Sequence, residues 1–470
     1  MTRIAVIGGG VGGLATALFS ARRGHRVTLF EQVDRRVGSD LDRDFFGWNR
    51  PAVPQAVQPH VFLSPVRSVL LDEAPDVYAA VLGMGATTQH ELDWFVERPP
   101  LRPGDEDLVA VRARRIVLEK ALADAVQREP GVESRYGDPV VGLVTEARSA
   151  IPRVLGVGSA SGTHAAELVV DAGGRRSRLP RWLDDAGCRQ VREERHRTGI
   201  AYFCRWYRLR SGSSPPKRTR TVSAAGFALA LVFPSDSDVF GIAVVVSTSD
   251  PTRGALRNPG VFDAVARAFP AAAVWLGLGP EPVSGVHTMA GLDNRWWGLA
   301  DRAGPVVAGV VGVGDCVIHT NPTLSQGVSL ALRTAQWTAV HAGIKAARDP
   351  ASLTAEHHHW TVTELKPWFD AQVETDRRKD EGLAAATVPA DPRARPGDEA
   401  ALMACSLDDP VVMRARAQVR HLIAPAEQAY GTDEVRAHLW RWRENHPGFV
   451  APHEGPGRDV WESLTTARDN

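Results

Sequence analysis

The chain has 470 residues, enough to bury one large core or roughly two or three smaller ones, which indicates a multi-layer protein rather than a small module. Hydrophobic residues make up 44% and charged residues 23% of the chain, close to the values of globular proteins, and this excludes a disordered chain. With 55 basic and 55 acidic residues the formal net charge is zero, so no basic field is available to attract nucleic acid or an anionic membrane.

The four cysteines (Cys188, Cys204, Cys316 and Cys405) show no CxxC or metal-ligand spacing, so we expect free thiols in a reducing compartment and no metal site. The N-terminus begins with a strand followed at once by glycines, without the basic region or cleavage site of a signal peptide. No apolar run approaches the roughly 20 residues needed to span a bilayer. We therefore expect a cytoplasmic protein with no membrane span.

The first elements in the chain predict a parallel sheet. Residues 3–7 form a short apolar run, and apolar residues then recur at helical spacing from Leu14 to Ala21. Residues 26–31 predict a second strand, so the order is strand, helix, strand, which requires parallel strands with a right-handed crossover. The stretch from about 40 to 100 predicts an excursion away from this sheet.

The middle of the chain changes in character. An apolar stripe over residues 111–126 predicts a helix, and a strand-rich segment follows that ends at Asp171. Between about 195 and 290 apolar and polar residues alternate as in an antiparallel sheet, which makes a plausible substrate-facing layer. The last third predicts a buried strand at 305–313, mostly helices from Pro322 to about 444, and an irregular tail after Pro447.

The first motif with a chemical meaning is Gly-Gly-Gly-Val-Gly-Gly at residues 8–13, a G-x-G-x-x-G that follows a strand and opens a helix. Gly8 permits the tight turn, Gly10 lets a pyrophosphate approach the backbone, and Gly13 lets helix and strand pack closely. Glu31 closes the next strand and can accept the ribose hydroxyls, which favours FAD or NAD over NADP. The residues expected to contact the dinucleotide are Gly8, Gly10, Val11, Gly12, Gly13 and Glu31.

A second motif lies about 300 residues later. A strand ends in Gly314-Asp315, and a glycine-containing turn then opens a helix near residues 326–330. A carboxylate in this place can bind a ribityl hydroxyl, and the helix N-terminus can face the anionic edge of a flavin.

These motifs in this order resemble the FAD-dependent monooxygenases related to para-hydroxybenzoate hydroxylase, and more distantly the flavin-dependent halogenases and geranylgeranyl reductases. The resemblance covers residues 3–31, about 111–180 and about 305–335. It implies an α/β fold in which a Rossmann-like FAD-binding domain is interleaved with an antiparallel-sheet substrate domain and followed by C-terminal helices.

The resemblance also assigns residues. The family's arginine that contacts the flavin, followed at three and seven residues by leucine, maps onto Arg115 with Leu118 and Leu122, in preference to Arg112 and Arg114. Asp315 resembles the residue that binds the ribityl chain, and Pro322 the proline that lines the flavin ring. The second set of expected cofactor contacts is Arg115, Gly314, Asp315, Pro322, Gln326, Gly327 and Val328. Gln55, Pro59 and His60 lie where related enzymes place flavin or substrate contacts, but a lone histidine is more often a loop hydrogen-bonder, and neither His60 nor His319 is given a role.

One block departs from the family pattern. Where the aromatic hydroxylases carry an Asp-Gly pair linked to FAD and NAD(P)H contacts, this chain has Gly173-Gly174, with glycine at the aspartate position. The electrons are therefore expected from NAD(P)H, either directly or through a separate flavin reductase.

The function implied is insertion of one oxygen atom from O2, by hydroxylation or epoxidation through a flavin C4a-hydroperoxide, into a lipophilic substrate of the secondary-metabolite type. No catalytic acid or base is named, because the flavin carries the hard chemistry. An FAD-dependent reductase or dehydrogenase of the same fold is the main alternative. A halogenase is disfavoured because the chain has no W-x-W-x-I-P motif and no lysine before Lys120, and a degenerate non-catalytic flavoprotein is disfavoured by the intact glycines.

The expected division of the chain is into three parts. The FAD-binding domain comprises residues 1–40, 101–190 and 291–340; the substrate-binding domain 41–100 and 191–290; and the C-terminal helical region 341–470.

Overall fold

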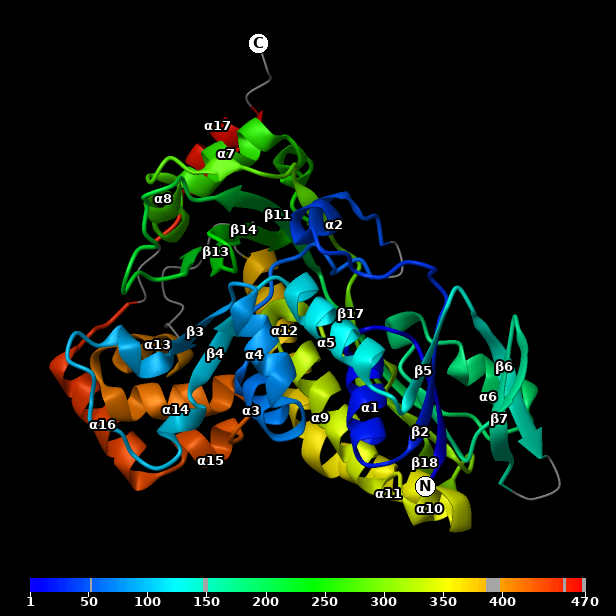
Figure 1. Ribbon diagram of the computed structural model, residues 1–470. Coiled ribbons are helices and arrows are strands. Elements are labelled where there is room, and N and C mark those ends of the chain that lie inside the picture. The colour runs from blue at the N-terminus through cyan, green and yellow to red at the C-terminus, as the bar shows by residue number, and fades with distance from the viewer. Residues whose placement is uncertain (51–52, 147–150, 386–397, 451–453, 467–470) are drawn as a thin grey trace.

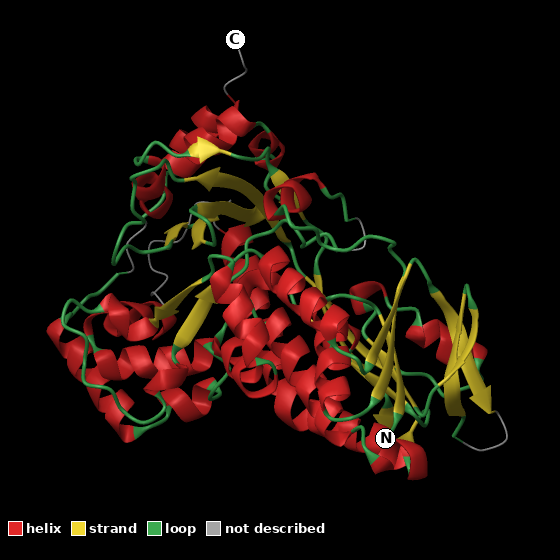
Figure 2. Cartoon of the chain, in the orientation of Figure 1, coloured by secondary structure: helices red, strands yellow, loops and turns green. Residues whose placement is uncertain are grey.

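The computed structural model describes residues 1–50, 53–146, 151–385, 398–450 and 454–466. Figure 1 shows a parallel sheet flanked by helices at the centre and right, an antiparallel sheet above, and a group of C-terminal helices at the lower left. Figure 2 shows the same arrangement by secondary structure, with helices and strands interleaved along the chain as expected for the α/β class. Within the described residues no helix combines the length and the apolar character that a bilayer crossing needs.

A five-stranded parallel sheet forms the centre of the molecule, in the order β20-β9-β1-β2-β5. Alternate residues of the central strand point to opposite faces, so Ile4 and Val6 enter one apolar core while Ala5 and Ile7 enter another. The predicted strand-helix-strand opening is therefore confirmed. The strands are β1 (Arg3–Ile7), β2 (Arg26–Glu31), β5 (Val132–Tyr136), β9 (Leu168–Asp171) and β20 (Val310–Gly312).

Different layers cover the two faces of this sheet. The core of Ile4 and Val6 is shared with three long helices and with two helices of the excursion, whereas the core of Ala5 and Ile7 is shared with a small antiparallel sheet and a short helix. The first layer contains α1 (Val11–Arg22), α5 (Arg115–Arg128), α9 (Gly327–His341), α3 (Ser64–Glu73) and α4 (Pro75–Gly83). The second contains β6 (Val140–Glu146), β7 (Arg153–Ser159), β8 (Gly162–Ala165) and α6 (Leu179–Asp185).

The predicted helix at 111–126 is wrong at its start. Residues Val109–Arg112 form strand β4, which pairs antiparallel with β3 (Thr87–His90), and α5 begins only at Arg115. The backbone of Arg114 is extended, with φ −64° and ψ 146°, because its N–H is used by a carboxylate described below. The apolar stripe therefore spans a strand and a helix in succession.

The predicted antiparallel sheet between residues 195 and 290 is confirmed, in the order β12-β13-β14-β11-β15, with β16 also paired to β11. On β13, Ala228, Ala230 and Val232 are buried against the outer helices, whereas Leu229 and Leu231 turn to the inner face and remain half-buried. The elements are β11 (Ile200–Arg208), β12 (Val222–Ala225), β13 (Ala228–Pro234), β14 (Val239–Ser247), β15 (Glu281–Pro282), β16 (His287–Met289), α7 (Pro259–Arg267) and α8 (Pro270–Leu276).

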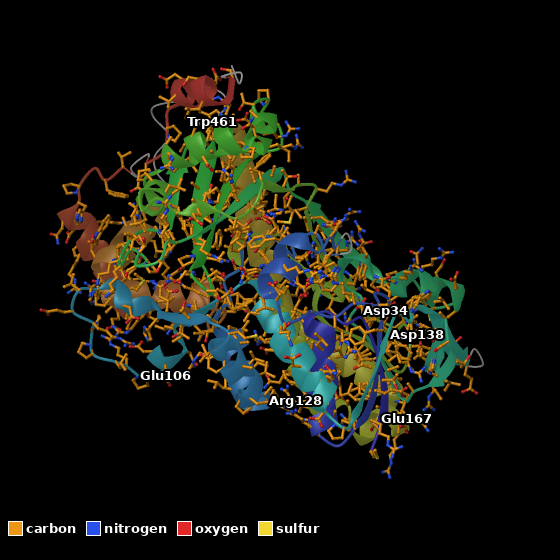
Figure 3. The ribbon with its side chains drawn as sticks, turned by 45° about the horizontal axis from the view of Figure 1, so that its top comes forward. Asp34, Glu106, Arg128, Asp138, Glu167 and Trp461 are labelled. Carbon is orange, nitrogen blue, oxygen red and sulfur yellow. The ribbon has the colours of Figure 1, made fainter. Side chains whose placement is uncertain are left out.

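The sequence predicted an irregular tail after Pro447, but part of this tail is helical. Residues Arg458–Thr466 form helix α17, which covers the outer face of the antiparallel sheet (Figure 1). Trp461 is fully buried there, with its ring edge-on to Phe227 and its indole N–H donating to Thr252 at 2.8 Å (Figure 3). A single buried tryptophan thus fixes a segment that its proline and glycine neighbours make look like a loop.

The strand expected at 305–313 is shorter, since only Val310–Gly312 pair in the parallel sheet and Gly304–Pro305 (β19) pair with Ala300–Asp301 (β18). The prediction of helices from Pro322 to about 444 is confirmed. They are, after α9, α10 (Ile344–Arg348), α11 (Pro350–Trp360), α12 (Lys366–Ala385), α13 (Asp398–Asp408), α14 (Pro410–Arg420), α15 (Ala426–Tyr430) and α16 (Asp433–Asn445). A last sheet joins β10 (Arg192–Arg197), β17 (Asp293–Gly298) and β21 (Ile318–His319).

A buried ion pair joins the antiparallel sheet to the start of α5. The Arg114 side chain is 1% exposed and that of Asp236, beyond the end of β13, is 0% exposed. The backbone N–H and the guanidinium Nη2 of Arg114 donate to this carboxylate at 2.7 and 2.6 Å, and Nη1 donates at 2.6 Å to Asp42 of α2 (Leu41–Gly47). Ser237 and Asp238 follow in the left-handed conformation, so the carboxylate sits at the tip of a tight hairpin turn.

Removing the carboxylate in Asp236→Ala would leave the Arg114 cation buried beside Asp42 alone. We expect a loss of about 3–5 kcal/mol in the free energy of unfolding, as is usual when one partner of a buried pair is removed. Asp301→Ala, in the exposed pair with Arg189, is the matched control and should cost no more than about 1 kcal/mol. Urea unfolding followed by circular dichroism measures both, and equal losses in the two variants would contradict the structural role of Asp236.

Candidate functional site

The glycines at the start of α1 each meet a different constraint. Gly8 has φ +104°, and a β-carbon on it would lie 2.4 Å from the carbonyl oxygen of Ala172. A β-carbon on Gly13 would lie 1.8 Å from the carbonyl oxygen of Gly8, so helix and strand pack at a distance that only glycine permits. At Gly10, by contrast, no described atom lies within 4 Å of the added carbon, which leaves room for a ligand against the backbone.

The carboxylate of Glu31 lies directly beside this glycine turn. It accepts hydrogen bonds from the backbone N–H groups of Gly9 at 2.7 Å and Val33 at 2.9 Å. Both contacts fix its position at the carboxyl end of β2, and each oxygen keeps lone pairs for a sugar hydroxyl. The geometry is that expected of an adenosine-ribose acceptor.

The second motif lies against the first. Gly314 has φ +66°, and a β-carbon on Gly314 or Gly12 would lie 3.1 and 3.7 Å from the β-carbon of Ala331 in α9, so α1, α9 and the Gly-Asp turn meet closely. Neither α1 nor α9 has a side-chain hydrogen bond at its N-cap (Gly10 and Gln326). Two helix N-termini with their positive dipole ends are thus available to anionic groups at neighbouring places.

Asp315 and Arg115 are brought into one electrostatic cluster. The Asp315 side chain is 23% exposed and lies 3.3 Å from Nδ1 of His319. Burial acts to raise the pKa of Asp315, but the charges of His319, Arg115 and Arg175 outweigh it and hold the pKa below its usual range. An ionised carboxylate is therefore maintained at the end of β20, where a hydroxyl donor can reach it.

The Arg115 guanidinium is held by a buried carboxylate that the sequence prediction missed. Its Nε donates at 2.8 Å to Glu119 one turn later in α5, and Arg50 donates to the same carboxylate. Glu119 is 3% exposed, so two arginines share one buried negative charge and a net positive charge remains. Burial and the Arg115 charge lower the pKa of His60 to about 4, so this imidazole stays neutral at physiological pH.

The three adjacent arginines are thereby separated in role. The guanidinium of Arg114 is fully engaged in hydrogen bonds with Asp236 and Asp42, and Arg112 lies on β4. Of the three arginines, only Arg115 is among the charges that lower the pKa of Asp315. This supports the choice of Arg115, whose contact with a cofactor stays a prediction.

Several buried polar atoms around the start of α9 have no hydrogen-bond partner among the described residues. They are Nε2 of His319, Oγ1 of Thr320, Oε1 of Gln326 and Oγ of Ser329. Buried polar groups are normally satisfied, so a cluster of orphans next to two open helix ends and the unfilled space at Gly10 fits a site for a polar cofactor. The donors and acceptors present suit the pyrophosphate, the ribityl chain and the ring edge of FAD.

A second buried network fixes the turn that contains Pro322. Asp376 of α12 is 2% exposed and accepts from Asn321 Nδ2 at 3.0 Å, Thr323 Oγ1 at 3.0 Å, Gln372 Nε2 at 2.9 Å and Asn294 Nδ2 at 2.8 Å. Neutral donors therefore surround the carboxylate. This arrangement defines the position of the 321–323 turn.

The Asp376 network also reaches the antiparallel sheet. The hydroxyl of Tyr202, on the inner face of β11, donates to Asn321 Oδ1 at 3.1 Å and lies 2.8 Å from Thr323 Oγ1. The backbone N–H of Asn321 donates to Asn294 Oδ1 at 2.6 Å. The turn at Pro322 is consequently held between β11, β17 and α12.

The block that departs from the family pattern has a structural explanation. The Asp171 carboxylate accepts from the backbone N–H of Gly173 at 3.0 Å and from the hydroxyl of Ser177, and burial raises its pKa. Gly174 has φ +71° in this turn. The buried acid closes the 171–177 turn rather than facing outward.

Not every predicted site residue presents its side chain. Val11 and Val328 are buried in the core that lies under the parallel sheet, so only their backbone N–H groups at the starts of α1 and α9 can face a cofactor. Glu119 was detectable, because it follows Arg115 by one helical turn. The local pattern around Asp376 offers only Gln372, one turn earlier on α12, whereas its other partners lie in other elements up to 82 residues away. Among the described residues no group of three or more His, Cys, Asp or Glu side chains is arranged to hold a metal ion.

Comparison with known sequences covers part of the chain. Residues 6–66 match the family model of the NAD(P)-binding Rossmann-like domain. Protein Rv3254 of Mycobacterium tuberculosis is 28% identical over 277 residues, which span 56% of this chain and 54% of that protein. The chain thus spans about half the length of the curated relative that it matches.

Comparison with solved structures covers most of the chain. PqsL, described as a probable FAD-dependent monooxygenase of Pseudomonas aeruginosa, superposes with a TM-score of 0.58 at 18% identity, over 82% of this chain and 99% of PqsL. The chain has the fold of an FAD-dependent monooxygenase. The anhydrotetracycline hydroxylase OxyS of Streptomyces rimosus gives a TM-score of 0.55 at 15% identity, over 89% and 75% of the two chains. The flavin-dependent brominase Bmp2 gives 0.57 at 15% identity, over 95% and 98%.

Gly13→Ala tests the close approach at the start of α1. Its β-carbon would collide with the Gly8 carbonyl, which must shift, so we expect a loss of about 1–3 kcal/mol or more in unfolding free energy and less FAD retained on purification. Gly47→Ala at the end of α2, where no described atom would lie within 4 Å of the new carbon, is the control and should leave both unchanged. The ratio of flavin to protein absorbance and a urea midpoint report the two effects.

Asp376→Asn tests the network at the Pro322 turn. An amide in place of the carboxylate brings an N–H donor to face at least one of the four donors, so at least one hydrogen bond is lost. We therefore expect a loss of about 1–3 kcal/mol in the free energy of unfolding and a changed visible spectrum of added FAD. Asp370→Asn on the same helix, where the carboxylate is exposed and paired with Lys366, is the control. An unchanged flavin spectrum in a folded Asp376→Asn protein would separate the network from the cofactor.

Proposed function

We propose that the protein is an FAD-dependent monooxygenase that inserts one oxygen atom of O2 into a lipophilic small molecule, by hydroxylation or epoxidation. The observation that carries the proposal is the convergence of two separate motifs at one edge of the parallel sheet. The glycine turn of α1 and the Gly314-Asp315 turn before α9 come together with two open helix N-termini and an ionised carboxylate between them. The fold shared with PqsL and OxyS supports the same conclusion.

Each set of residues has a separate task in this proposal. The backbone at Gly10 and the N-terminus of α1 bind the pyrophosphate of FAD, and Glu31 accepts hydrogen bonds from the ribose. Asp315 accepts from the ribityl chain, and Arg115 supplies positive charge beside it. The remaining predicted cofactor contacts are Gly8, Val11, Gly12, Gly13, Gly314, Pro322, Gln326, Gly327 and Val328.

The flavin supplies the oxygen chemistry when bound, and the protein excludes water and positions the substrate. The inner face of the antiparallel sheet provides an apolar wall for this purpose. Leu229 and Leu231 of β13 are half-buried there and pack with Tyr202 and with Leu383 of α12. A lipophilic substrate of the secondary-metabolite type suits such a wall. No side chain is assigned as a catalytic acid or base.

The electron source is NAD(P)H, used either directly or through a separate flavin reductase. The absence of the aspartate at Gly173 and the commitment of Asp171 to its own turn both favour the reductase route. Bleaching of the bound flavin by NADPH or NADH alone, under anaerobic conditions, would establish the direct route.

A reductase or dehydrogenase of the same fold is the second candidate, because oxygen reactivity depends on the flavin environment rather than on the fold. The halogenase alternative is weaker, although the fold is shared with Bmp2. The first lysine of the chain, Lys120, is engaged with Asp124 of the same helix at 2.5 Å.

The proposed function is tested by loading the protein with FAD, reducing it anaerobically with dithionite and mixing it with O2 in a stopped-flow spectrometer. We expect a transient absorbance band that belongs to neither oxidised nor fully reduced flavin. Direct reoxidation with no transient, with and without candidate substrates, would favour the reductase, and failure to bind FAD would contradict the proposal.

Asp315→Asn is the variant that connects this experiment to the site. Loss of the ionised acceptor should weaken FAD binding by about tenfold or more, since hydrogen bonds to a charged group are among the stronger ones. Asp370→Asn, which changes an exposed carboxylate of α12 that is paired with Lys366, should bind FAD as the wild type does. Fluorescence quenching of FAD on titration with apoprotein measures both affinities.

A further inference from the structure

The carboxylate of Asp315 is held from one side only. Its Oδ2 lies 3.3 Å from Nδ1 of His319, and among the residues that the structure describes no other hydrogen bond or ion pair reaches this side chain. Glu31, the acceptor in the first motif, is by contrast fixed by two backbone N–H groups. Because an aspartate side chain can rotate about two bonds, the orientation of Asp315 depends on the imidazole.

His319 lies between two carboxylates. Its side chain is 9% exposed, with Nδ1 towards Asp315 and Nε2 at 3.8 Å from Oδ1 of Asp293, whose side chain is 3% exposed. Within the described ranges neither this Nε2 nor this Oδ1 has a hydrogen-bond partner, so two buried polar atoms face each other just beyond hydrogen-bonding distance. A neutral imidazole has one N–H and an imidazolium has two, so only the cation can donate to both carboxylates.

The three-stranded sheet β10-β17-β21 brings these groups together. His319 stands opposite Arg295, and Arg295 stands opposite Arg195, so the three side chains share one face of the sheet. Asp293 precedes Arg295 by two residues and therefore points to the same face. Oδ2 of Asp293 accepts from Nε of Arg195 at 2.6 Å and from Nη2 of Arg295 at 3.1 Å, which leaves Oδ1 for the imidazole.

The electrostatics agree with this geometry. Burial acts to raise the pKa of Asp293, but the two arginines and the imidazole outweigh it and hold the pKa below its usual range. Burial acts in the same direction on Asp315, and the charge of His319 is the strongest of those that oppose it. Both carboxylates are therefore ionised, and the imidazole between them is a donor that they share.

We propose that His319 is a positioning residue of the cofactor site, whose Nδ1–H holds the Asp315 carboxylate in the orientation that accepts a hydrogen bond from a ribityl hydroxyl. Asp293 supports the ring from its other side. The inference rests on the proposed function, because it assigns the support of a residue that the FAD site would use. His319 acts through Asp315 and needs no contact of its own with the cofactor.

The test is a double-mutant cycle of His319→Gln and Asp315→Asn, in which the affinity for FAD is measured by fluorescence quenching. We expect His319→Gln alone to weaken FAD binding by about five- to tenfold, since hydrogen bonds to charged groups are among the stronger ones. Because His319 acts through Asp315, adding His319→Gln to Asp315→Asn should cost no more than about a further twofold. Losses that multiply in the double variant would overturn the proposal, because they indicate an independent structural role.

His319→Asn is the conservative variant. The amide nitrogen of asparagine stands close to the place of Nδ1, whereas that of glutamine reaches the place of Nε2. His319→Asn should therefore keep most of the affinity that His319→Gln loses. A loss in His319→Asn as large as that in Asp315→Asn would overturn the proposal, even if His319→Gln did not fold.

His359→Gln, at an exposed position of α11, is the matched control and should bind FAD as the wild type does. Urea midpoints establish that each variant is folded before its affinity is compared. The two proposals fail in different ways. A wild-type protein that binds no FAD contradicts the proposed function and this inference with it, whereas FAD binding that weakens in Asp315→Asn but not in His319→Gln overturns only the role of His319.

Discussion

The buried pair of Arg114 and Asp236 is the contact on which the geometry of the molecule depends. The tip of the β13–β14 hairpin carries the carboxylate, and the residue just before α5 carries the guanidinium, so one interaction sets the antiparallel sheet over the edge of the parallel sheet. Desolvating both charges is costly, and only multiple, well-directed hydrogen bonds offset that cost. Because such bonds tolerate little displacement, the pair restricts the sheet to one position.

This restriction matters because the next residue in the chain serves the cofactor site. Arg114 and Arg115 are consecutive but point to different partners, since Arg114 is the extended N-cap and Arg115 begins the helix. Fixing the N-cap fixes the first turn of α5, and Glu119, one turn on, then holds the Arg115 guanidinium. The position of the apolar wall and the position of the proposed flavin-binding arginine are therefore set by the same few atoms.

Local patterns predicted the parts of the site that are built from adjacent residues. The turn at Gly8 and Gly13 follows from backbone sterics within a single strand-helix unit. The Gly314-Asp315 turn, after another strand of the same sheet, also needs a glycine with positive φ. The predicted start of α5 was wrong because β4 pairs with β3, which overrides the local helical pattern. The predicted irregular tail was wrong at α17 because Trp461 is buried against Phe227. Asp376 was beyond prediction for the same reason. On α12 it resembles any exposed helical carboxylate, and three of its four neutral donors, from Asn294, Asn321 and Thr323, are brought to it only by tertiary packing.

The C-terminal helices thus do more than complete the fold. Asp376 of α12 fixes the Pro322 turn, and Leu383 of the same helix packs with the inner face of the antiparallel sheet. The glycine turns and helix N-termini that suit FAD lie at one edge of the parallel sheet, whereas the proposed substrate surface is shared between sheet and C-terminal helices. Substitutions in these helices are therefore expected to alter which molecule is bound more than whether the cofactor is bound.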